Sequence, residues 1–114
     1  MQFFMIETNH LLVLTTCPDQ RCAESIATAL VSSNLAACVN IQPGLRSVYR
    51  WQGAIESSEE VLLIIKSIAE RYQEVETAIR DLHPYELPEV IAVPIVAGSK
   101  SYLRWLEAGV QRSQ

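Results

Sequence analysis

The sequence predicts an α+β fold of the ferredoxin-like split βαβ type, an antiparallel sheet with two helices on one face. Two observations lead to this class. Apolar runs of strand length alternate with helical patterns in the order β-α-β-β-α-β, and a short terminal helix follows. Between the helical patterns, two extended runs meet at Gln52-Gly53, where glycine can supply the positive φ of a two-residue hairpin turn. The 114 residues, 49% of them hydrophobic, are expected to form a single domain, 1–114.

The first strand and the first helix are predicted from the N-terminal third of the chain. His10 to Thr16 is a nearly continuous apolar run, which is typical of a strand buried on both faces. Asp19 or Thr16 can cap the helix that follows, and Asn34 can end it. The buried stripe of this helix is expected to hold four residues: Cys22, Ile26, Ala29 and Leu30.

The hairpin comes next and is long for its domain. Its first arm, Leu35 to Trp51, would reach roughly 50 Å at about 3.3 Å per residue, whereas a compact domain of this length is roughly 35 Å across. Its second arm contains the wholly apolar run Val61 to Ile65, which favours a central strand. Unless Pro43-Gly44 bends the hairpin back, four apolar residues lie beyond the core: Val48, Tyr49, Trp51 and Ile55.

The last third of the chain predicts a helix, an edge strand and a second helix. The period is helical from Arg71 to Leu82, and Pro84 ends that helix. Its buried stripe is expected to hold Tyr72, Val75, Ile79 and Leu82. Glu89 to Val96 is a fourth strand, placed at an edge or a bulge by Pro94. Ser99 can cap the last helix, which carries Tyr102, Leu103, Trp105 and Leu106.

Helices on one face leave the other face of the sheet uncovered. Because the strands are apolar on both faces, the second face must be buried against something, and a symmetric oligomer is the economical solution. The overhanging hairpin tip leads to the same expectation, since its apolar groups need a neighbouring subunit to cover them.

Charge and composition exclude several classes of partner. The net charge is −4 and the nine basic residues are scattered singly, which argues against nucleic acid. Residues 1–9 lack a basic leader and are expected to be loosely ordered, and no segment approaches the length of a membrane span. We therefore expect a soluble, cytoplasmic protein. The three cysteines, Cys17, Cys22 and Cys38, lack zinc-type spacing and are expected to be thiols.

Several sequence motifs resemble those of the CutA family of divalent-cation tolerance proteins. They are LAACVNI at 35–41, PG at 43–44, SVYRWQG at 47–53, HPYE at 83–86 and YLRWL at 102–106. The resemblance runs from about Leu11 to Leu106. It implies a ferredoxin-like subunit in a very stable homotrimer, similar in architecture to the PII signalling proteins, and an association with copper tolerance and metal binding.

The chain departs from the family pattern at two places. Family members discussed as copper binders carry a cysteine at the end of the first strand, where this chain has Thr15, with Cys17 two residues further on. They also carry a pair of histidines before the Pro-Tyr, where this chain has Leu82-His83.

Three residues are candidate metal ligands: His83, Cys38 and Cys17. A thiolate at Cys38 and an imidazole at His83 suit copper or another divalent cation, and Glu59 could complete the set. The alternatives are that Cys38 is a small buried hydrophobe and that His83 interacts with the last carbonyls of its helix. Cys17 precedes a helix N-terminus, where the dipole can depress a thiol pKa, and its alternative is an ordinary exposed thiol in a loop. No organic cofactor is expected.

A ligand cleft between subunits is expected to use eight residues: Cys38, Tyr49, Trp51, Glu59, Lys66, Tyr85, Glu89 and Trp105. The alternative for most of the aromatic members is that they anchor the subunit interface. Lys66 ends a buried strand, so it must reach water or pair with a carboxylate such as Glu59 or Glu89. An acidic rim or a solvated surface is expected from Glu56, Glu59, Glu60, Glu86 and Glu89.

The leading hypothesis is a cytoplasmic, homotrimeric divalent-cation tolerance protein that binds metal ions such as copper at clefts between subunits. The alternative is a PII-like trimeric sensor of small molecules, or a scaffold, that signals to a partner protein. An enzyme with Cys38 or Cys17 as nucleophile and His83 as base is not expected, because no catalytic motif spacing is present.

Overall fold

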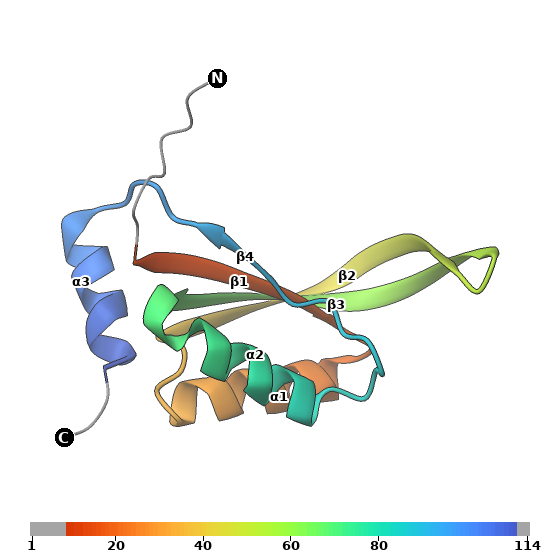
Figure 1. Cartoon of the computed structure of the whole chain (residues 1–114), viewed down its shortest axis with the longest axis horizontal. Coiled ribbons are helices and arrows are strands. Elements are labelled where there is room, and N and C mark those ends of the chain that lie inside the picture. The colour runs from red at the N-terminus through yellow and green to blue at the C-terminus, as the bar shows by residue number, and fades with distance from the viewer. Residues whose placement is uncertain (1–8, 112–114) are drawn as a thin grey trace.

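The computed structural model describes residues 9–111 and contains one four-stranded sheet (Figure 1). The elements are β1 (His10–Cys17), α1 (Gln20–Ser32), β2 (Cys38–Trp51), β3 (Ala54–Ile68), a 3-10 turn (Ala69–Arg71), α2 (Tyr72–Leu82), β4 (Ile91–Pro94) and α3 (Lys100–Gly109). The strand order is β2-β3-β1-β4 and every neighbouring pair is antiparallel. The predicted order of elements, with its split βαβ connectivity, is confirmed. The segment 1–9, expected to be loosely ordered, lies outside the described residues except for Asn9.

Helix α1 begins and ends where its sequence predicts. The Asp19 carboxylate accepts a hydrogen bond of 2.8 Å from the Cys22 backbone N–H, which caps the first turn. At the other end, Asn34 has a φ of +59°, a conformation that stops a helix. The expected stripe was partly wrong, because the buried side chains are Ala23, Ile26, Ala27 and Leu30. Periodicity marks the apolar side of a helix, but packing decides which residues lie at its centre.

The hairpin turns at Gln52-Gly53, as predicted. Both residues have positive φ, +49° and +83°, as a type I′ turn requires. Pairing with β3 runs from Cys38 to Trp51, interrupted by one extra residue between Gln42 and Leu45. This bulge does not fold the arm back, and Figure 1 shows the hairpin extending well beyond the helices.

Helix α2 covers the same face of the sheet as α1 (Figure 1). Val75 and Ile79 are fully buried, as predicted. Leu82 was expected on the buried stripe but is exposed, because the helix ends there and His83 takes the buried position. At the start of the helix, the buried Arg71 donates from Nε to the Val110 carbonyl oxygen at 2.9 Å.

Strand β4 is shorter than expected, four residues in place of Glu89 to Val96. It lies at the sheet edge, as Pro94 predicted, and pairs only with Leu11–Leu14 of β1. Helix α3 begins at the predicted cap, where Ser99 Oγ accepts from the Tyr102 N–H at 3.2 Å. None of the helices in the part of the chain that the structure describes has the length and apolarity needed to cross a membrane.

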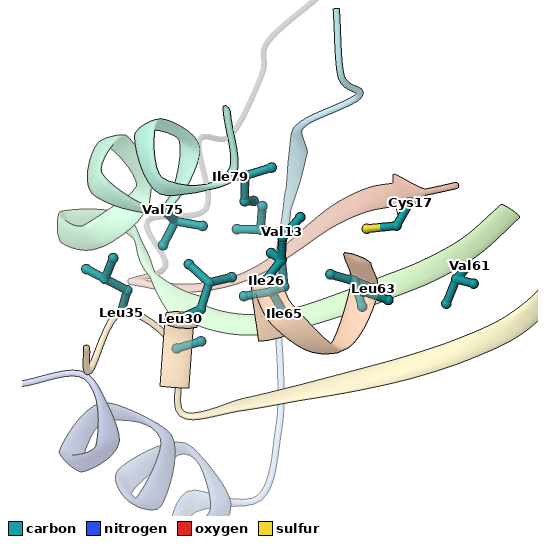
Figure 2. Packing of buried hydrophobic residues seen from close by; sticks show 12 residues of the cluster. Val13, Cys17, Ile26, Leu30, Leu35, Val61, Leu63, Ile65, Val75 and Ile79 are labelled. Atoms are coloured by element: carbon teal, nitrogen blue, oxygen red, sulfur yellow. The ribbon is translucent and has the colours of Figure 1, made fainter. Parts of the chain in front are cut away.

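One apolar core lies between the sheet and the two helices α1 and α2 (Figure 2). Side chains opposite one another on antiparallel strands share a face, so Val13 with Ile65 and Cys17 with Val61 form rows that face the helices. The core comprises Val13, Cys17, Ala23, Ile26, Leu30, Leu35, Ala36, Val61, Leu63, Ile65, Val75 and Ile79.

The alternate side chains form what we call the open face, the side of the sheet away from α1 and α2. Strand pairing gives two complete rows across it: Cys38-Lys66-Leu12-Val93 and Asn40-Ile64-Leu14-Ile91. Leu12, Leu14 and Ile64 are only partly buried, and Ile91 is 50% exposed. An apolar sheet face is thus left incompletely covered by the described chain, as the sequence predicted.

Candidate functional site

A groove of about 700 Å³ lies where the hairpin leaves the body of the protein. We call it the hairpin groove. The hairpin, the end of β1 and the segment 84–89 contribute its lining residues, which are Thr16, Ser47, Val48, Tyr49, Trp51, Glu60, Pro84, Tyr85, Glu86, Leu87 and Glu89. A smaller hollow of about 340 Å³ follows α2 and is lined mainly by polar side chains. The hairpin groove is the one that combines aromatic walls with a buried carboxylate.

The register of the hairpin brings the aromatic wall and the carboxylate together. Beyond the bulge, Leu45 pairs with Glu60, Tyr49 with Glu56 and Trp51 with Ala54. Paired residues share a face, and side chains alternate along a strand. Glu60, Tyr49 and Trp51 therefore lie on the continuation of the open face.

His83 fixes the opposite wall of the groove. Its Nε2 lies 2.7 Å from the Thr16 carbonyl oxygen, and its Nδ1 accepts from the Tyr85 backbone N–H at 3.1 Å. A carbonyl can only accept, so the proton is on Nε2 and the imidazole is neutral. The His83 and Tyr85 rings also pack together with centroids 4.6 Å apart. The buried histidine thus holds Tyr85 in place.

Tyr85 in turn holds the carboxylate of Glu60. Its hydroxyl donates to Glu60 Oε2 at 3.1 Å, and only 7% of Glu60 is exposed. Burial, and then the hydrogen bond and negative charge of Glu60, raise the pKa of Tyr85 to about 12. Tyr85 is therefore a protonated donor at neutral pH, and Glu60 keeps its other oxygen for a ligand.

The groove has acidic and aromatic chemistry. Its lining includes the carboxyl groups of Glu60, Glu86 and Glu89 and no lysine or arginine. Aromatic faces and carboxylates together favour ligands that carry positive charge or hydrogen-bond donors.

Four of the eight residues predicted for a ligand cleft line this groove: Tyr49, Trp51, Tyr85 and Glu89. Glu59 does not line it, and its neighbour Glu60 does. Because side chains alternate along β3, only one of two consecutive residues faces the groove. The sequence assigned Glu60 only to an acidic rim, and the hairpin register was the missing signal.

Cys38 and Lys66 lie at the other end of the sheet. They pair across β2 and β3, with Lys66 Nζ 4.0 Å from Cys38 Sγ and hydrogen-bonded to the side-chain oxygen of Asn40. The expectation that Lys66 pairs with Glu59 is wrong within one chain. Lys66 lies on the open face, whereas Glu59, seven residues earlier in the same strand, lies on the opposite one.

Trp105 lies outside the groove, on α3. Its ring packs against Tyr102, with centroids 5.6 Å apart, and both rings are largely exposed. The structure of one chain thus separates the eight predicted cleft residues into four places, of which the face that carries Glu59 is one.

Cys17 has neither of the environments expected for it. It is the last residue of β1, it is fully buried, and Figure 2 shows its sulfur turned toward the core cluster. Burial is the main cause that raises the pKa of Cys17 to about 12, and the nearby Cys22, Asp19 and Glu60 raise it further. The expected depression by the helix dipole was wrong, because desolvation outweighs it.

The three candidate metal ligands do not converge within one chain. Cys17 pairs with Val61 of β3, and Cys38 pairs with Lys66 of the same strand. Val61 and Lys66 are five residues apart, which is roughly 16 Å at the rise of a strand. Both ring nitrogens of His83 are already engaged. Among residues 9–111 no group of three or more His, Cys, Asp or Glu side chains is arranged to hold a metal ion. A metal site built from Cys17, Cys38 and His83 of one chain does not fit this geometry.

The fold and the groove define a class of small α+β proteins in which a β-hairpin overhangs a split βαβ subunit and bounds an acidic, aromatic groove. The family profile described as CutA1 divalent ion tolerance protein matches residues 11–109. This chain belongs to the CutA1 family, as its motifs indicated.

Individual relatives agree with this assignment. The divalent-cation tolerance protein CutA of Thermus thermophilus is 46% identical over 95 residues, which cover 83% of this chain and 92% of the relative. The crystal structure of CutA from Xylella fastidiosa superimposes with a TM-score of 0.89 at 43% identity, covering 91% of this chain and 100% of that one. A CutA from Archaeoglobus fulgidus, described as periplasmic, gives 0.87 at 37% identity, covering 90% and 99%.

Proposed function

We propose that this chain takes part in divalent-cation tolerance as a cytoplasmic homotrimer that binds metal ions such as copper between its subunits. The names of its relatives support the role in cation tolerance. A cytoplasmic location is favoured by its three cysteines, which a reducing compartment keeps as thiols.

The observation that carries the assembly is the uncovered apolar surface. The open face presents Ile91 and Val93 on an edge strand, and the hairpin tip presents Val48, 70% exposed, and Ile55, 65% exposed. Apolar surface of this kind marks protein interfaces. A closed ring of three copies can cover every hairpin tip with a neighbouring subunit, and a PII-like arrangement of split βαβ subunits is one such ring.

The separation of the donors within one chain supports metal binding between subunits. Among the described residues, one chain does not gather three donors, and a complete set would combine donors of more than one copy. The carboxylates of the hairpin groove and the thiol of Cys38 on the open face are the donors best placed to be shared.

A matched pair of variants tests the assembly. Ile91→Glu places a charge on the open face, whereas Val31→Glu places one on α1, at 42% exposure compared with 50% for Ile91. We expect sedimentation to give three times the chain mass for the wild type and for Val31→Glu, and a smaller, folded species for Ile91→Glu. A wild-type protein that sediments as a folded single chain would refute the assembly.

Metal titration of the same variants tests the shared sites. Calorimetry with Cu²⁺ and Zn²⁺ should show saturable binding to the wild type and to Val31→Glu, and loss of binding to dissociated Ile91→Glu. Undiminished binding by the dissociated variant would show that the donors belong to one chain and would refute sharing.

A second candidate function is a PII-like small-molecule sensor that signals to a partner protein. The volume and aromatic wall of the hairpin groove favour it. The chain has two tryptophans, Trp51 in the groove and Trp105 outside it, so a bound ligand should alter the fluorescence of one only. With a panel of cationic metabolites, Trp51→Phe should abolish the response and Trp105→Phe should preserve it. The reverse result would exclude the groove.

A further inference from the structure

The carboxyl groups that line the hairpin groove lie apart from one another. Glu60 comes from β3, whereas Glu86 and Glu89 come from the segment 84–89. In the part of the chain that the structure describes, no three carboxylate, thiol or imidazole groups converge well enough to hold a metal ion. Within one chain, a single point charge therefore does not contact all three carboxyl groups. The negative charge of the groove is distributed over its walls.

The Glu60 carboxylate has an oxygen that a ligand can reach. Only 7% of the residue is exposed, and its Oε2 accepts from the Tyr85 hydroxyl, which leaves Oε1 without a hydrogen-bond partner among residues 9–111. In the same residues, Thr15 Oγ1 is the one unpartnered side-chain polar atom that is sealed from solvent. Glu60 Oε1 is therefore still reachable from the groove that Glu60 lines. A carboxylate oxygen in this position favours an N–H donor from a ligand.

The aromatic side chains extend the groove from Glu60 toward the hairpin tip. Leu45 pairs with Glu60, and Tyr49 and Trp51 follow along β2 on the same face. At about 3.3 Å per residue, Trp51 lies roughly 20 Å beyond Leu45 along the strand. Tyr49 is held by Ser58, whose hydroxyl donates to the Tyr49 hydroxyl at 3.4 Å. Aromatic faces attract cations and also pack against methylene groups. An elongated cation with apolar stems thus suits the groove better than a compact one.

We propose that the hairpin groove binds a linear aliphatic polyamine, a molecule whose ammonium groups are joined by methylene chains. One ammonium group donates to Glu60 Oε1, and the methylene chain lies along Tyr49 and Trp51. A second ammonium group reaches Glu86 or Glu89. The lining contains no lysine or arginine that would repel such a ligand. This inference rests on the second candidate function, a sensor of small molecules, and names the class of ligand that the groove takes.

Putrescine and butylamine are a matched pair of probes, because they share a methylene chain and differ by one ammonium group. The Trp105→Phe protein is the reporter, since it leaves Trp51 as the only tryptophan. At physiological ionic strength, we expect putrescine and spermidine to change the fluorescence of Trp51 and to saturate one site per chain. Butylamine should bind about fivefold more weakly than putrescine, because it lacks the second charge. Equal affinity for the two probes would overturn the proposal.

Glu60→Gln tests the ammonium contact, and Glu24→Gln is its control, because Glu24 is exposed on α1 and lies outside the groove. The affinity for putrescine should fall roughly tenfold in Glu60→Gln and stay unchanged in Glu24→Gln. Glu89→Gln is a second groove variant at an exposed position, so it spares the core, and it should weaken binding about threefold. Unchanged affinity in both groove variants would overturn the proposal.

A compact quaternary cation, tetramethylammonium, separates this inference from the function on which it rests. A response of Trp51 to tetramethylammonium or butylamine without one to putrescine would overturn the polyamine and leave small-molecule binding in the groove intact. Silence of Trp51 toward every cation of the panel would refute both the polyamine and the sensor.

Discussion

Replacing Tyr85 by phenylalanine removes the hydroxyl that donates to Glu60 and leaves that carboxylate, 7% exposed, without the bond. Hydrogen bonds to charged groups contribute about 1.5–3 kcal/mol. Tyr85 itself is 40% exposed, so water can partly replace its hydroxyl, and the lower end applies. We therefore expect Tyr85→Phe to lower the free energy of unfolding by about 1.5 kcal/mol.

A double-mutant cycle isolates the bond. Glu60→Gln removes the charge and should cost less than Tyr85→Phe, and the double variant should cost less than the sum of the two by on the order of 1 kcal/mol. Guanidinium unfolding at a fixed protein concentration measures all four proteins. Tyr102→Phe, on α3 with a similarly exposed ring, is the control and should stay within about 0.5 kcal/mol of the wild type. Strict additivity of the two groove substitutions would refute the coupling.

Titration of the phenol gives an independent measure of the same contact. Because Glu60 contributes to raising the pKa of Tyr85 from 10.0 to about 12, Glu60→Gln should lower it, and burial should keep it above 10.0. A folded-state pKa above the unfolded one stabilises the protein below pH 10, and this contribution is lost as the pH rises through about 12. Ultraviolet absorbance of the tyrosinate reports the pKa, and an unchanged value in Glu60→Gln would contradict the assigned cause.

Three further predictions follow from buried polar groups. The Thr15 hydroxyl is buried and has no hydrogen-bond partner among the described residues, so Thr15→Val should raise the free energy of unfolding by about 1 kcal/mol, and a loss in urea denaturation would contradict this. Arg71→Lys removes the Nε–H that bonds the Val110 carbonyl and should cost about 2 kcal/mol in the same assay, whereas the exposed Arg80→Lys should change little. The raised pKa of Cys17 stabilises the protein below pH 9.0 and this contribution is lost toward pH 12, so stability measured from pH 8 to 11 should fall less in Cys17→Ala than in the wild type, and parallel curves would refute it.

Local sequence signals predicted the local structure well. The Asp19 and Ser99 caps, the Gln52-Gly53 turn and the Pro94 edge strand each depend on a few neighbouring residues, and all four were confirmed. The order of elements followed from hydrophobic periodicity. Local geometry of this kind can be predicted because its physical causes act between residues a few positions apart in the sequence.

The candidate site depended on long-range geometry, and the sequence predicted only part of it. Glu60 rather than Glu59 enters the groove because of strand register, which periodicity does not supply. The environment of Cys17 depended on the extension of β1 by one residue past Thr16, which turned an expected loop thiol into a core thiol. His83 is hydrogen-bonded to Thr16 and Tyr85. These two residues lie on opposite sides of α2 in the sequence and come together only in the fold.

The extra residue of β2 at Pro43-Gly44 has a consequence that reaches the far end of the hairpin. Before the bulge, even-numbered residues of β2 pair with even-numbered residues of β3, as Cys38 does with Lys66. After the bulge, odd-numbered residues of β2 pair with even-numbered residues of β3, as Leu45 does with Glu60. That single step of parity is what presents Tyr49 and Trp51, in place of Val48 and Arg50, to the side occupied by Glu60. The same sequence paired without the bulge would turn valine and arginine toward Glu60 instead, whereas deletion of the extra residue would keep the aromatic wall, because Leu45 would still pair with Glu60.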